Sequence, residues 1–147
     1  MILATLLYGC ENELANKAVT QDEKITSFLE SEYADVPVIY NKGVNRIVLQ
    51  EGDSTLFAAP GDLVSFEYDA HKFTTSIGTS FATGETSCYL GRGELIDGLE
   101  YGIEGMCPGE KAYIIFSCKY GYKETVAGIG RDEALVFEVV MNDISRE

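Results

Sequence analysis

The chain has 147 residues, of which 46% are hydrophobic and 24% are charged, and its formal net charge at pH 7 is −13. A chain of this length and composition is expected to form one globular domain with some additional sequence, and it needs no disulfide bonds to bury a core. The negative charge argues against binding to nucleic acid or to an anionic membrane surface, because both need an excess of Lys and Arg. The single histidine, His71, is too little for a histidine-rich metal site or a histidine-based triad. We expect neither a metal nor a cofactor.

The N-terminal segment MILATLLYGC is a run of apolar or small residues that ends in Cys10, and the chain becomes polar directly after it. LYGC resembles the lipobox of bacterial lipoproteins, in which a signal peptidase cleaves before a cysteine that is then lipidated. The run is too short to span a bilayer, and it lacks a basic n-region, so an upstream start stays open. The alternative is a buried strand or an apolar tail. We expect lipidation at Cys10 and a location in the bacterial cell envelope, facing the periplasm or the cell surface.

A helix is predicted from about residue 20 to 33, because Thr20 and Glu23 have the spacing of a capping box and apolar residues share one face behind them. The residues of that face are Ile25, Phe28 and Leu29. We expect packing to be the role of this helix, with partner binding as the alternative. Residues 11–19 are predicted to be a flexible tether, and residues 35–40 a short extended piece.

From Gly43 onward the pattern is that of β-strands separated by turns. Residues 63–70 alternate most clearly, with Val64, Phe66 and Tyr68 on one face. Further strands are predicted at residues 44–50, before a turn at 51–53, and at residues 87–91, 111–120 and 134–144. A single helix is predicted at residues 93–103, an irregular stretch at 70–85 and a long loop at 121–134. The body of the chain is therefore predicted to be an α+β domain, an antiparallel sheet with one short helix.

Three cysteines follow Cys10, and their spacing matches neither a zinc ribbon nor a CxxC redox motif. They are Cys88, Cys107 and Cys118. We expect ordinary buried or half-buried thiols that pack as small apolar side chains. Disulfide bonds between them are open but not required.

The segment YLGRGELIDGLEYGIEGMCPGEKAYI, residues 89–114, holds six glycines around one short amphipathic helix and no obvious nucleophile. With GVNRIVLQEGD and GDLVSFEY before it, and YGY and ALVFEVV after it, it resembles the FKBP-type peptidyl-prolyl cis-trans isomerases. The resemblance runs from Gly43 to about Ile144. It implies an FKBP-like half-barrel sheet wrapped around the short helix, within residues 43–147. Residues 20–42 would then be a helical extension, and residues 1–19 a signal remnant and tether.

The resemblance also implies a pocket lined by apolar and aromatic side chains. By position, its catalytic residues would be Tyr68, Phe81, Tyr122 and Phe137. Its substrate-binding residues would be Leu95, Ile96, Leu99 and Ile129. The backbone N–H of Ile96 and the hydroxyl of Tyr122 would donate hydrogen bonds to a proline-containing peptide. Gly98 and Gly102 would let the helix approach the sheet closely.

The absence of a nucleophile agrees with this chemistry, because prolyl isomerisation neither makes nor breaks a covalent bond. The barrier of about 18–20 kcal/mol comes from lost amide resonance. An apolar pocket can favour the twisted amide, and each ~1.4 kcal/mol of preferential binding gives about tenfold in rate.

Two positions depart from the family pattern. Where the family usually has Phe-Asp-Ser or Phe-Asp-Thr, an alignment on Phe81 places Ala82 at the Asp, and an alignment on Phe73 places Thr74 there. Neither supplies a carboxylate, although Glu85 or Asp69 lie nearby in the sequence. Leu99 stands where the family most often has Trp. We therefore expect weak isomerase activity or none, with peptide binding retained.

Three hypotheses follow. The first is a prolyl isomerase of the cell envelope that assists the folding of exported proteins. The second is a non-catalytic, chaperone-like module that binds proline-containing or unfolded polypeptide segments, and the third is a structural lipoprotein with a closed pocket. In each case we expect a monomer whose contact with the membrane is limited to a lipid anchor. A lipocalin-like carrier is excluded, because about six strands do not close a large ligand barrel.

Overall fold

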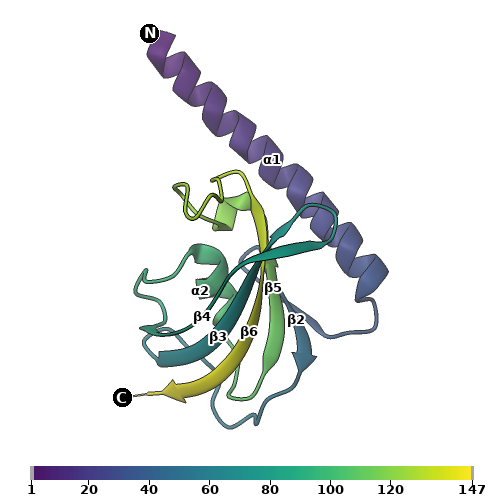
Figure 1. Ribbon diagram of the computed structural model, residues 1–147, viewed down its shortest axis with the longest axis vertical. Helices are drawn as coiled ribbons and strands as arrows, with labels where there is room; N and C mark the ends of the chain where they lie inside the picture. Colours follow the sequence, from purple (N-terminus) through teal and green to yellow (C-terminus); the bar gives the residue numbers. More distant parts are fainter. Residues whose placement is uncertain (1, 147) are drawn as a thin grey trace.

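The computed structural model describes the backbone of residues 2–146 and the side chains of residues 12–146. An N-terminal helix is followed by six strands, one short helix and one 3-10 turn (Figure 1). In chain order the elements are α1 (Ile2–Glu32), β1 (Val38–Asn41), β2 (Val44–Gln50), β3 (Leu63–Phe73), β4 (Ile77–Tyr89), α2 (Asp97–Ile103), β5 (Lys111–Phe116), η1 (Cys118–Tyr120) and β6 (Ala134–Ser145). The strands form one antiparallel sheet in the order β1-β2-β5-β6-β3-β4. The predicted α+β fold is confirmed.

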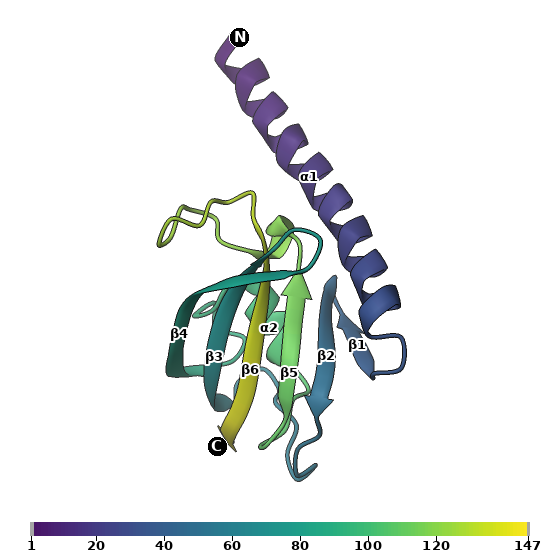
Figure 2. The ribbon, with the colours of Figure 1, turned by 45° about the vertical axis from the view of Figure 1, so that its right-hand side comes forward.

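The sheet has a buried core on each face, because α2 covers one face and the C-terminal half of α1 covers part of the other (Figures 1 and 2). Strand β5 shows how the sequence encodes both cores. Ile114 and Phe116 belong to the core under α2, and Ile115 between them belongs to the core under α1. Successive side chains of a strand point to opposite faces, so a strand buried on both faces needs a continuous apolar run.

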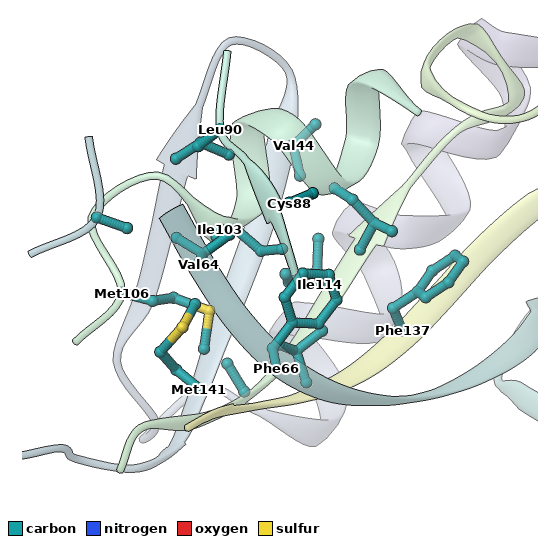
Figure 3. Close-up of a cluster of buried hydrophobic side chains, with 14 of the residues drawn as sticks. Val44, Val64, Phe66, Cys88, Leu90, Ile103, Met106, Ile114, Phe137 and Met141 are labelled. Carbon is teal, nitrogen blue, oxygen red and sulfur yellow. The ribbon is translucent and has the colours of Figure 1, made fainter. Parts of the chain in front are cut away.

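The core under α2 is the larger of the two. Figure 3 shows Phe66 and Ile114 at its centre, with Met106 and Met141 at one end and Phe137 at the other. Helix α2 comes close to the sheet through its glycines: a Cβ atom at Gly98 would overlap the ring of Phe116, and one at Gly102 would overlap Ile114. The close approach predicted for these glycines is therefore found.

Helix α1 begins much earlier than predicted. Residues 11–19, expected to be a flexible tether, are helical. Thr20 is not a cap but lies inside the helix, where its hydroxyl donates to the carbonyl of Asn16 at 3.1 Å. The segment ENELANKA consists largely of good helix formers, and Ala18 is buried against the body of the protein.

The apolar face predicted for the helix packs as expected: Ile25 and Phe28 lie in the core under α1. The side chain of Cys10 lies outside the described residues. Among the residues that the structure describes, no helix is both long enough and apolar enough to cross a membrane.

The stretch at residues 70–85, predicted to be irregular, is a long hairpin instead. Strands β3 and β4 pair along most of their length and meet in a tight connection at residues 74–76. Most side chains of β4 are exposed or half-buried, so the strand lacks the apolar alternation that would have identified it. The predicted helix at 93–103 forms only over Asp97–Ile103, and the strand predicted at 111–120 ends at Phe116.

The cysteine prediction is confirmed for the described part of the chain. Cys88, Cys107 and Cys118 are buried free thiols. Burial, with nearby carboxylates, raises the pKa of the Cys88 thiol to about 11. Such a thiol stays protonated at neutral pH and packs as an apolar group.

Candidate functional site

A cavity of about 360 Å³ opens between α2, the β3–β4 hairpin and the loop after η1. Seven of the eight predicted pocket residues line it: Tyr68, Phe81, Leu95, Ile96, Leu99, Tyr122 and Phe137. The other lining residues are Phe66, Ala82, Thr86, Glu94, Val126 and Ala127. Sequence reasoning overlooked Phe66, although its place two residues before Tyr68 on the same strand face was a usable signal.

Ile129 is the predicted pocket residue that does not line this cavity. It is 2% exposed and packs in the core under α2. Its N–H and carbonyl pair with the backbone of Val126 at 2.8 and 3.0 Å. This pairing makes a tight turn, which presents Val126 and Ala127 to the cavity in its place.

A β-bulge decides which aromatic residue of the hairpin reaches the cavity. Ala70 pairs with Ala82 and His71 pairs with Ser80, so Phe81 is the extra residue on β4. A bulge lets two consecutive side chains break the strict alternation of a strand, and both Phe81 and Ala82 line the cavity.

The alternative alignment places Phe73 in the pocket, and the structure argues against it. Phe73 is buried on the opposite face of the sheet, in the core under α1, with its ring 5.3 Å from that of Phe28. Ala82 therefore occupies the place next to the pocket aromatic.

Aromatic rings form one wall of the cavity. The ring of Tyr68 lies 6.1 Å from that of Phe137, which in turn stacks on Phe116 at 6.0 Å. A Cβ atom at Gly84 would lie 2.8 Å from the Tyr68 hydroxyl oxygen. Glycine on β4 thus leaves room for this ring above the sheet.

Two hydrogen-bond donors belong to the same cavity. Burial, and then the neighbouring Tyr68, raises the pKa of Tyr122, so its hydroxyl keeps its proton at neutral pH. Ile96 precedes α2 in an extended conformation, and its carbonyl accepts from the N–H groups of Leu99 and Glu100 at 3.0 Å. Within the described residues, the N–H of Ile96 donates to no other backbone group.

Carboxylates are scarce in the cavity. Asp69 and Glu85, which the sequence offered as substitutes for the missing Asp, do not line it. Glu85 pairs across the hairpin with Glu67, whose pKa is raised because the two carboxyl groups share a hydrogen bond. Glu94 is the one carboxylate among the lining residues, and its Oε2 accepts the N–H of Tyr89 at 2.6 Å.

A buried ion pair supports α2 from behind. The guanidinium of Arg46 donates through Nη1 to the carbonyls of Gly102 and Glu104 at the C-terminal end of α2, at 3.1 and 2.8 Å. Its Nε lies 3.0 Å from Oε2 of Glu110, and both residues are nearly inaccessible, at 4% and 6% exposed. Sequence reasoning missed this pair, because its only local sign is a single charged residue, Arg46, in the largely apolar strand β2.

Cation-binding chemistry has little support here. Within the described residues, no cluster of three or more His, Cys, Asp or Glu side chains has the arrangement to hold a metal ion. What the cavity offers is apolar and aromatic surface with two neutral hydrogen-bond donors.

Comparison with known proteins agrees with this geometry. A family profile described as FKBP-type peptidyl-prolyl cis-trans isomerase matches residues 54–142. The human peptidyl-prolyl cis-trans isomerase FKBP10 is 39% identical over 88 residues, which cover 57% of this chain and 15% of that protein. A Schizosaccharomyces pombe peptidyl-prolyl cis-trans isomerase is 33% identical over 87 residues, covering 54% of this chain and 73% of that protein. FK506-binding protein 1 of Candida albicans is 35% identical over 108 residues, covering 63% of this chain and 86% of that protein.

The matched segment thus spans about 15% of the FKBP10 proteins of human and cattle, and most of the shorter fungal relatives. The match runs from before β3 into β6 and includes every residue that lines the cavity. The chain belongs to the family of FKBP-type peptidyl-prolyl cis-trans isomerases.

Proposed function

We propose that the cavity binds proline-containing polypeptide segments and that the protein is a prolyl isomerase of low activity. The observation that carries this proposal is the cavity itself, an apolar and aromatic enclosure with the Tyr122 hydroxyl as a protonated donor. Its named relatives are peptidyl-prolyl isomerases, which supports the same reaction class.

The cavity would act by favouring the twisted amide over the planar one. Rotation about the X–Pro bond removes amide resonance and makes the amide less polar, so apolar walls such as Phe66, Phe137 and Leu99 stabilise the twisted form relative to water. The N–H of Ile96 and the hydroxyl of Tyr122 are expected to hold peptide carbonyls on either side of the bond. No proton is transferred, so no group needs an activated pKa.

Two substitutions support the expectation of low activity. Ala82 removes the carboxylate that, by family resemblance, would organise hydrogen bonds next to Phe81. A hydrogen bond to a charged group contributes roughly 1.5–3 kcal/mol, which corresponds to a loss of about tenfold to a hundredfold in rate. Leu99 is smaller than Trp and leaves a deeper cavity, which holds the proline ring less tightly.

The alternative function is a peptide-binding module without turnover, and the same two residues favour it. Binding needs the apolar walls and the donors, whereas acceleration needs contacts that improve in the twisted state. Such a module would bind extended proline-containing segments of unfolded proteins.

Nuclear magnetic resonance exchange on a short Leu-Pro peptide, with the full chain and its Ala82→Asp variant, separates these functions. Clear catalysis by the unmodified chain supports the isomerase. Catalysis only in Ala82→Asp supports the binding module, because the cavity is then intact and lacks one group. If neither protein catalyses exchange and no peptide-induced shift appears at Ile96 or Tyr122, both proposals are refuted.

We further propose that the protein is a lipoprotein of the bacterial cell envelope, lipidated at Cys10 and assisting the folding of exported proteins. The LYGC sequence supports this location. Cys10 lies one helical turn before Leu14, whose carbonyl accepts from the Cys118 thiol, so an anchor at Cys10 would lie close to the body of the domain. Metabolic labelling with a fatty-acid probe tests it: label is expected on the full-length protein and not on Cys10→Ser, and an unlabelled wild type would refute the anchor.

A further inference from the structure

A second cavity, of about 410 Å³, lies between the middle of α1 and the segment that begins at η1, and we call it the α1 groove. Figures 1 and 2 show η1 beside the middle of this helix. The helix contributes apolar side chains to the groove, among them Leu14, Ala18 and Val19, and Val19 is 58% exposed. The opposite wall includes Cys118, whose thiol donates to the carbonyl of Leu14 at 3.8 Å.

The α1 groove adjoins the proline cavity. Tyr122 lines both of them. A third hollow, over residues 93–97 and 121–126, shares Leu95 and Ile96 with the proline cavity and Lys123 with the α1 groove. A polypeptide with its proline in the first cavity therefore has a concave path around the segment 121–126 into the groove.

The α1 groove is also positively charged, on a chain whose net charge is −13. Eleven Lys and Arg residues are present, and among the side chains that the structure describes six of them pair with a carboxylate within 4.0 Å: Lys17, Lys42, Arg46, Lys72, Lys111 and Arg146. Three of the other five line the groove, namely Lys119, Lys123 and Arg131. Within the described residues none of these three has a carboxylate within that distance, and the groove contains one carboxylate, Asp22.

The path between the two cavities has the opposite charge. Glu94, Asp97 and Glu124 line the third hollow together with Lys123. Three carboxylates outweigh Lys123 along this path, so a carboxylate on a bound chain would be repelled there and attracted most strongly where it reaches Lys119 and Arg131. The charge pattern therefore specifies a position for an acidic residue, not a general preference for acidic peptides.

We propose that the α1 groove is a second subsite for the polypeptide whose proline occupies the first cavity. It binds an apolar side chain against Ala18 and Val19, and an adjacent carboxylate at Lys119 and Arg131. The substrates are thus extended chains in which an apolar–acidic pair lies at a fixed distance from the proline. This inference rests on the proposed function, since it needs a proline segment in the first cavity.

Binding of two peptide series to the full chain tests the proposal. Each peptide carries one Leu-Pro core and a neutral Gly/Ser extension, and a Leu-Glu pair is moved along the extension, on the N-terminal side in one series and on the C-terminal side in the other. At one window of positions the pair is expected to tighten binding about tenfold over the neutral extension. The gain should shrink as salt is raised, because ionic attraction is screened.

Substitutions of groove residues test whether the gain in affinity arises in the α1 groove. Val19→Asp and the double variant Lys119→Glu/Arg131→Glu change exposed side chains and are expected to abolish the gain while leaving the affinity of the Leu-Pro core unchanged. Lys24 is a cation on the same helix outside the groove, with no carboxylate partner among the described side chains, so Lys24→Glu is the matched control and should retain the gain. Peptide-induced shifts at Val19 and Cys118 should appear with the extended peptide and not with the core.

The outcomes distinguish failure of the second subsite from failure of the proposed function on which it rests. If the Leu-Pro core fails to shift Ile96 and Tyr122, the proposed function is wrong. If the core binds but no position of the Leu-Glu pair improves affinity, or if the groove variants keep the gain, the second subsite alone is overturned. A gain at every position would also overturn it, because general attraction would then explain the effect.

Discussion

Replacing Arg46 by Met tests whether a buried ion pair holds the pocket helix in place. The substitution removes two hydrogen bonds to the C-terminal end of α2 and leaves the Glu110 carboxylate, in a residue 6% exposed, without its partner. Breaking a buried pair from one side costs roughly 3–5 kcal/mol. That is a large part of the stability of a domain this size, about 5–15 kcal/mol.

The dependence on pH identifies the cause. Burial already raises the pKa of Glu110 above its usual value, and loss of the guanidinium raises it further. A carboxyl group with a raised pKa in the folded state binds protons that the unfolded state has released, so stability falls as pH rises through that window. The loss in the free energy of unfolding of Arg46→Met relative to wild type, its stability deficit, is therefore expected to be smallest below about pH 4.3, the usual pKa of Glu. The deficit should grow toward neutral pH.

Urea unfolding across this pH range measures the deficit, with Arg46→Met/Glu110→Gln as the matched control. The double variant should lose the extra pH dependence and recover part of the stability, because its buried side chains are uncharged. A loss under about 1 kcal/mol at pH 7 would refute the reasoning. So would a loss that is the same at every pH, since the stranded carboxylate would then not be its cause.

Two other predictions concern contacts far apart in the sequence. Arg146 binds both oxygens of Asp62 at 2.8 and 2.7 Å and holds the pKa of that carboxyl below its usual range. The stabilisation from this ion pair should be present above the usual pKa of Asp and should be lost as pH falls through the lowered pKa. The melting temperature of Arg146→Ala should therefore match that of wild type only in strong acid. A difference in melting temperature that stays the same at every pH would contradict this. Gln21 of α1 donates to the carbonyl of Asp132 at 2.8 Å and accepts the N–H of Cys118 at 2.8 Å. Gln21→Ala should speed hydrogen exchange at Cys118 by about threefold to tenfold, with Lys24→Ala as control, and unchanged exchange would argue against the tie between α1 and the loop.

Some of the site was recognisable from local patterns. The alternation of residues 63–70 predicted that Tyr68 and Phe66 share a face, and the structure places both at the cavity. Leu95, Ile96 and Leu99, which the family resemblance placed in the pocket, all line the same cavity, although only Leu99 lies in α2 and Ile96 precedes it in an extended conformation. The prediction for residues 63–70 holds because side-chain direction along a strand follows from backbone periodicity alone.

Other parts carried no local signal. Strand β4 is rich in Thr, Ser and Gly and largely exposed, so its place depends on pairing with β3 rather than on an apolar pattern. The bulge at Phe81 is a property of that pairing, and it decides between Phe81 and Phe73. Ile129 matched by position but is buried in the core under α2, where its backbone pairs with that of Val126.

The sequence by itself determined the α+β class and the glycine-spaced pocket helix, because these depend on short-range periodicity and on residue types that only certain backbones accept, and its resemblance to a family supplied most of the pocket residues. Only the tertiary structure decided that α1 continues through residues 11–19, that Arg46 and Glu110 meet under α2, and that Lys119 and Arg131 face Val19 across a groove. The ion pair and the groove each join residues distant along the chain, and α1 at residues 11–19 packs Ala18 against the body of the protein. Such contacts are set by how whole elements pack, and no local pattern of residues records that packing.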